Sequence, residues 1–274
     1  MNAFLLTIGG LAFFLYLVVP VLVLRKMWFD AEPVFETVDH DDPRLPEKAR
    51  AFFGDVAADI EALGFTPTAF VINREVAPNT TGYIALFDNH AAMDAAAAMF
   101  IVSVTGTAAP PILNYNVDFA TDFADGGELD TGNASAPGGL PTRRSKQVHR
   151  VPRMADLATL YRLHQSLVLQ RGGLAKKPLP PKNQAVAAFR EAVVSEFRWH
   201  AECGRLRLDP AKARYHFTWR GGYMAVWGQL PPILQVCRWL LRRRARALLR
   251  QFDLASDYAT VDFRQRYEGY SLDT

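Results

Sequence analysis

The chain has 274 residues, of which 50% are hydrophobic and 22% are charged, and its formal net charge is +3. This balance excludes an intrinsically disordered chain, which would be poor in apolar residues and high in net charge. Its two cysteines, Cys203 and Cys237, lie in different segments, which excludes a disulfide framework and suits a reducing compartment. The length allows one larger domain or two small ones.

An apolar stretch near the N-terminus predicts a membrane helix. Residues 3–24 hold no charged side chain, and at about 1.5 Å per residue a helix of this length spans about 33 Å, enough for a hydrocarbon core of about 30 Å. A cleaved signal peptide is the alternative, but no basic residue precedes the stretch and no small-residue cleavage site follows it. We therefore expect residues 1–26 to form a transmembrane anchor.

The residues after this stretch predict the orientation of the anchor. Arg25 and Lys26 are its first charged flank, so the positive-inside rule leaves the N-terminus outside and the bulk of the chain in the cytoplasm. Glycosylation sequons at Asn79 and Asn133 favour the opposite side, but so short a pattern often arises by chance. We expect a single-pass membrane protein with residues 25–274 on the cytoplasmic side.

The first half of the remaining chain has an α+β pattern. Residues 27–44 are acidic and contain proline, which indicates a linker. Apolar residues then recur at helical spacing from Pro46 to Leu63, and Gly64 marks a helix end. Short β-branched and aromatic runs follow, divided by turn residues, and predict an antiparallel sheet of about five strands. The expected strands are 69–73, 82–87, 97–104, 112–121 and 128–131, although the alanine run at 91–98 favours a helix.

The second half is expected to be mainly helical. A basic loop begins at residue 143, and helices at 154–170 and 183–200 precede a β-hairpin within 205–218. The fold class is therefore α+β, with one N-terminal transmembrane helix, a helix packed on an antiparallel sheet, and a mainly helical C-terminal half. The expected segments after the linker are a sheet domain at 45–142, the basic loop, helices and hairpin at 143–221, an amphipathic basic helix at 222–252 and a polar tail at 253–274.

The near-neutral total hides two oppositely charged halves. Residues 27–142 hold 18 acidic and 4 basic side chains, whereas residues 143–250 hold 5 acidic and 23 basic ones. Such asymmetry indicates a separate partner for each half.

The basic charge is densest in the segment 231–252. Arginines recur there every four residues and form one stripe on a helix, while leucines gather on the other side and Arg244 interrupts that apolar face. This pattern is typical of a helix lying in the headgroup plane of an anionic leaflet. Two alternatives stay open: a face that is solvated or packed on the acidic half, and a second span through 222–241, which Pro231 and Pro232 would interrupt. The expected lipid-binding residues are Arg238, Trp239, Arg242, Arg243, Arg246 and Arg250.

Carboxylates gather near the end of the predicted sheet, at Asp122, Asp125, Glu128 and Asp130. Their spacing differs from that of a calcium loop, and Asp-Gly between two strands indicates a hairpin turn. We therefore predict no metal site and no cofactor. Asp118, with Asp122 and Glu128, could still supply an acid/base pair if a cleft joins them.

No catalytic residue is nominated, because the nucleotide-binding glycine motifs, the serine-hydrolase elbow and the zinc-protease motif are all absent from the sequence. We expect a membrane-tethered cytoplasmic module that binds anionic lipid headgroups and a protein or small ligand. A membrane-bound enzyme using the sheet carboxylates is the first alternative. A membrane-tethered nucleic-acid binder, which would use the helix 183–200 and the basic hairpin after it, is the one we expect least.

Overall fold

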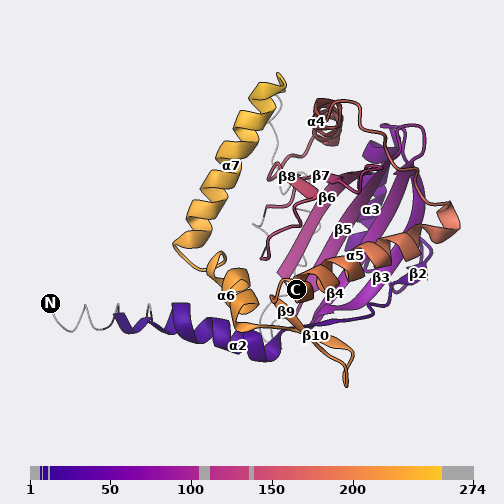
Figure 1. Cartoon of the computed structure of the whole chain (residues 1–274). Helices are drawn as coiled ribbons and strands as arrows, with labels where there is room; N and C mark the ends of the chain where they lie inside the picture. The colour runs from indigo at the N-terminus through magenta and orange to yellow at the C-terminus, as the bar shows by residue number, and fades with distance from the viewer. Residues whose placement is uncertain (1–6, 8, 12, 105–111, 136–138, 255–274) are drawn as a thin grey trace.

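The computed structural model describes residues 7, 9–11, 13–104, 112–135 and 139–254. It is a mixed α+β fold in which a seven-stranded sheet carries helices on both faces and a three-stranded sheet lies at one end (Figure 1). Nearly all of the expected polar tail, residues 253–274, lies outside the described part of the chain.

The start of the N-terminal helix projects from the rest of the molecule, and its end lies beside α6 (Figure 1). It contains a π-helical turn, η1 (Phe14–Val18), followed by α2 (Val19–Lys26). Among the described residues, Gly9–Lys26 is the one helix long and apolar enough to cross a membrane. Its side chains are largely exposed, 58% for Leu11 and 61% for Phe13, which a soluble core helix would not show.

The main sheet is larger than the sequence predicts. Its order is β2-β3-β4-β5-β6-β7-β8, and all neighbours are antiparallel except β7 and β8, which are parallel. Five strands match the expected runs, and the two additional strands lie at the edges, in the predicted linker and the predicted basic loop. These two edge strands are short and polar, so they lack the apolar alternation by which a strand is predicted from sequence. The strands are β2 (Glu36–Val38), β3 (Thr66–Ala77), β4 (Thr80–Asn89), β5 (Asp94–Ser103), β6 (Ile112–Asp122), β7 (Glu128–Gly132) and β8 (Lys146–Arg150).

The alanine run forms a strand, not a helix. Alanines 95–98 lie in β5 at the middle of the sheet, where both neighbouring strands hydrogen-bond to them. Ala96 and Ala98 are buried on one face, and their small side chains leave room for helix and aromatic groups above. Pairing on both edges thus overrides the intrinsic helical preference of alanine.

Helices cover the two faces of the sheet. The predicted first helix, α3 (Glu47–Glu61), packs Phe52, Phe53 and Ile60 into the main core. Helix α4 (Leu157–Gln170) lies on the same face, and α5 (Ala185–Glu202) covers part of the other face with Val186 and Phe189.

The smaller sheet joins the segment after the N-terminal helix to the hairpin in the second half of the chain. The predicted hairpin forms as β9 (Leu206–Asp209) and β10 (Arg214–Phe217), and β1 (Trp28–Asp30), from the expected linker, pairs with β10. The segment directly after the N-terminal helix is therefore fixed to the C-terminal half.

The last expected helix is two helices. A short α6 (Trp219–Trp227) ends at Gly228, and α7 (Ile233–Gln251) begins after Pro231 and Pro232. The prolines separate them because neither can donate a backbone hydrogen bond within a helix.

Candidate functional site

Helix α6 lies against the N-terminal helix. The Trp227 Nε1 donates to the Tyr16 carbonyl at 2.9 Å, and the Tyr223 hydroxyl to the Leu17 carbonyl at 3.4 Å. At the other end of α6, a Cβ on Gly222 would lie 2.6 Å from a Leu24 methyl group. Helix α6 therefore runs antiparallel along the second half of the apolar stretch, so the turn before α7 lies beside residues well inside that stretch.

The start of α6 is held by the side chain of Thr218 and by a close backbone contact at Gly221. The Thr218 side chain accepts from the Gly221 amide at 3.1 Å and donates to the Gly204 carbonyl at 2.8 Å, which ties the start of the helix to the hairpin. A Cβ on Gly221 would lie 1.9 Å from the Arg205 carbonyl oxygen. Only glycine therefore permits this close approach.

Helix α7 forms an edge of the molecule and runs steeply across the direction of α2 (Figure 1). Its second half is held on the domain, because Ala245 and Leu249 are buried and Leu248 and Phe252 pack against the main core. Its first half is not covered in the described structure: Val236 is 52% exposed and Trp239 54%.

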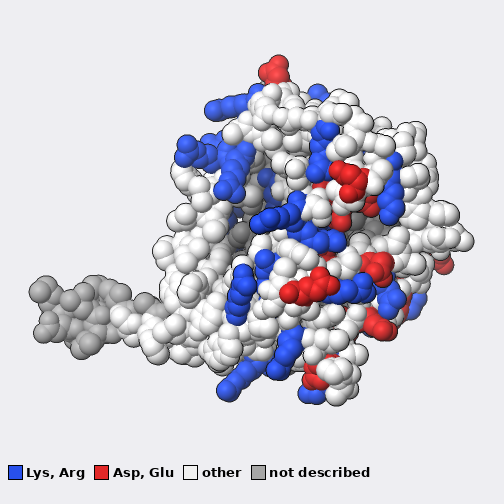
Figure 2. Space-filling view, in the orientation of Figure 1, with Lys and Arg blue, Asp and Glu red and all other residues white. Residues whose placement is uncertain are grey.

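The predicted lipid-binding residues all lie on this helix and are exposed. Basic side chains gather along the margin of the molecule that α7 forms (Figure 2). Among the described residues no carboxylate forms an ion pair with an arginine of α7 (Arg243 instead lies over Trp239, 5.5 Å from the ring centre). The described residues thus offer no support for packing this stripe on the acidic half.

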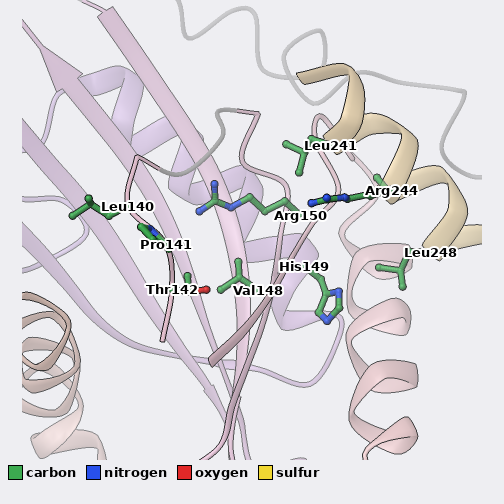
Figure 3. A pocket seen from close by; sticks show the side chains of 10 residues that line it. Leu140, Pro141, Thr142, Val148, His149, Arg150, Leu241, Arg244 and Leu248 are labelled. Atoms are coloured by element: carbon green, nitrogen blue, oxygen red, sulfur yellow. The ribbon is translucent and has the colours of Figure 1, made fainter. Parts of the chain in front are cut away.

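The sequence did not single out the hollow beside α7. It has a volume of about 360 Å³ and lies between α7, β8 and residues 140–142 (Figure 3). A second hollow of about 620 Å³ opens at α6 and shares Leu140 and Pro141 with the first.

The sheet carboxylates lie on β6 and β7, and Arg143 links Glu128 among them to Glu196 of α5. The register places Asp118, Gly132 and Arg150 side by side on three neighbouring strands. The Asp118 carboxylate lies over Gly132, where a Cβ would be 1.5 Å from its oxygen. Burial and the charge of Asp130 raise the pKa of Asp118 to about 6, against the opposing charge of Arg150.

The four weak metal candidates do not converge. Lys146 binds Asp130 at 2.6 Å and Glu128 at 3.3 Å, so a cation already neutralises that pair. The exposed Asp125 accepts from the Gly127 amide at 2.8 Å in the hairpin turn. Burial and Glu128, its cross-strand neighbour, raise the pKa of Asp122. Within the described ranges no three His, Cys, Asp or Glu side chains are grouped as metal ligands.

A second polar cluster, which the sequence gave no reason to expect, lies under α4. Its centre is Asp94, which is fully buried and accepts from Lys176 at 2.7 Å and from Thr121 at 2.5 Å. His164 is buried between Thr121 and Thr131, and burial lowers its pKa to about 4. These groups satisfy one another, which indicates a stabilising network.

No family model, no curated protein and no solved structure matches the chain. The functional inference therefore rests on the geometry of α6, α7 and the sheet face.

Proposed function

We propose that the chain is a membrane-tethered cytoplasmic binding module whose helix α7 lies on the anionic inner leaflet. One observation carries this proposal. The hydrogen bonds from α6 to the backbone of Tyr16 and Leu17 hold α6, and with it the start of α7, beside a stretch that is long and apolar enough to cross a bilayer. With the N-terminus outside, as the basic pair Arg25 and Lys26 favours, the domain and α7 share the inner side.

The surface of α7 suits this position. Val236, Trp239 and Leu240 are exposed near its start, where they can enter the boundary between headgroups and acyl chains. The exposed arginines on the remaining surface can reach lipid phosphates, and each basic residue near an anionic leaflet contributes about 1 kcal/mol. Replacing Arg242, Arg243 and Arg246 by glutamine should therefore weaken the contact by about 3 kcal/mol, or roughly 100-fold.

The native cysteines allow a direct test of depth. Cys237 lies on α7 and Cys203 follows α5, so each can carry one nitroxide label after the other is replaced by serine. In vesicles of phosphatidylglycerol, the full chain labelled at Cys237 should be shielded from a water-soluble relaxation agent and accessible to oxygen. The label at Cys203 should remain accessible to the water-soluble agent.

The triple arginine variant is the matched comparison, since it keeps every apolar residue of α7. Its Cys237 label should be more accessible to water already at low salt, whereas the parent label should become accessible only as salt screens the arginines. Equal accessibility in phosphatidylglycerol and phosphatidylcholine, with no effect of the triple variant, would exclude the leaflet contact.

A second function, an enzyme using the sheet carboxylates, has one observation in its favour. Asp118 is half-buried on the sheet face, and its pKa of about 6 allows it to give or take a proton near neutral pH. Cross-linking of the Asp118 carboxyl by a carbodiimide with a pH midpoint near 4 would remove that support.

A further inference from the structure

Arg244 differs from the other arginines of α7 in its direction. In the sequence it interrupts the apolar face of the helix. In the structure its side chain points from α7 into the hollow, toward strand β8, between Leu241 and Leu248 of the same helix (Figure 3). Arg244, which interrupts the apolar face of the helix, therefore lines the hollow.

The walls of this hollow favour a negative charge. Arg150 on β8 and Arg244 on α7 both line it, and none of its described lining residues is acidic. Arg150 also faces Asp118, whereas Arg244 has no carboxylate within ion-pair distance in the described chain. Arg244 is itself exposed, and the planar donors of its guanidinium match two oxygens of a phosphate.

The adjoining hollow is mainly apolar and lies along α6, the helix that packs against the N-terminal helix. Tyr223, Met224 and Trp227 of α6 line it, and Trp227 is the residue that donates to Tyr16. The two hollows share Leu140 and Pro141 in their walls, so a hollow lined by two arginines adjoins one that is mainly apolar. A basic hollow next to an apolar one matches a ligand with a negatively charged head and an apolar chain.

We propose that these hollows bind one anionic phospholipid from the inner leaflet, with its phosphate at Arg244 and an acyl chain along α6. This inference deepens the proposed function and rests on the leaflet position of α7. It gives the module a ligand class, and it separates Arg244 from the arginines that face the bilayer surface.

Native mass spectrometry of the full chain, released from a neutral detergent, tests the site. Titration with phosphatidylglycerol should give one retained lipid per chain, and phosphatidylcholine should give far less. Arg244→Gln should weaken retention about 10- to 100-fold, because one charge-assisted contact is lost. The control is Arg198→Gln, the same change at an exposed arginine of α5, and it should leave the retained lipid unchanged.

A second variant tests the mainly apolar hollow. Met224→Trp, which adds bulk to the α6 hollow, should reduce retention of long-chain phosphatidylglycerol more than that of a short-chain form. Thermal unfolding of each variant should match the parent, which verifies that folding is intact. Equal losses in the Arg244 and Arg198 variants, or no preference for the anionic lipid, would overturn the proposal.

Inorganic phosphate distinguishes a lipid site from a simple anion site. If inorganic phosphate at millimolar concentration displaces the retained lipid, the acyl chain adds nothing to the affinity and the hollow is a simple anion site. The depth measurement at Cys237 stands apart from these results. A deep label without a retained lipid refutes only this inference, whereas a retained lipid with a water-exposed label refutes the leaflet position of α7.

Discussion

Replacing Asp94 by asparagine should destabilise the protein strongly. The Asp94 side chain is fully buried, and its oxygens accept from Lys176 at 2.7 Å, Thr121 at 2.5 Å and the Tyr161 hydroxyl at 2.8 Å, as well as from Gln165. Asparagine keeps the size of the side chain. It removes the negative charge and turns an amide group toward these donors.

The magnitude follows from the buried ion pair. Removing one partner leaves the Lys176 ammonium, whose side chain is 16% exposed, without its counter-charge, and such a loss costs about 3–5 kcal/mol. For a domain of this size about 1 kcal/mol lowers the melting temperature by about 2–4 °C, so Asp94→Asn should lower it by roughly 6–20 °C.

Thermal unfolding of the full chain in detergent, followed by circular dichroism, measures this effect. Asp125→Asn is the matched control, because Asp125 is exposed in a turn and asparagine can accept the same hydrogen bond from Gly127. Lys176→Met and the double variant complete a mutant cycle. A melting temperature for Asp94→Asn within about 2 °C of the control, or strictly additive effects in the cycle, would refute the reasoning.

Three further outcomes are expected. Gly221→Ala should lower stability by about 1–3 kcal/mol, because its Cβ would meet the Arg205 carbonyl at 1.9 Å, whereas Gly228→Ala, with open space around it, should not; chemical unfolding compares the two. His164 has its pKa lowered by burial from 6.5 to about 4, so its contribution is complete above pH 6.5 and falls as the pH drops toward 4. His164→Asn should reduce that acid-side loss in pH-dependent unfolding curves. Asp118 has its pKa raised from 3.8 to about 6, mainly by burial, so its ionisation costs stability above pH 6, and the cost disappears as the pH falls toward 3.8. Asp118→Asn should therefore raise the melting temperature near pH 7.5 and have little effect near pH 4.

Much of the fold could be predicted because it is encoded locally. The absence of charge over residues 3–24 predicts a helix with the length and apolarity to cross a membrane, and Gly9–Lys26 has both. Helical spacing predicts α3, and alternation bounded by turn residues predicts five of the sheet strands and the hairpin. These elements can be predicted because the spacing of apolar residues within each one is enough to indicate its type.

The tertiary structure decided the remaining pairings. Strands β1, β2 and β8 are three to five residues long, so they exist only because a neighbouring edge supplies their hydrogen bonds. The parallel pairing of β7 and β8 likewise depends on how the chain crosses between them, which no local pattern specifies.

The sites divide in the same way. The arginine stripe of α7 follows from four-residue spacing, since residues at that interval share one side of a helix. Local spacing does not predict the ion pair of Asp94 with Lys176, which is 82 residues away. It also does not predict that Arg244 lines the hollow beside β8. Sequence fixes which face of an element is polar, but only packing decides which distant face it meets, because that choice depends on the shape and burial of both surfaces together.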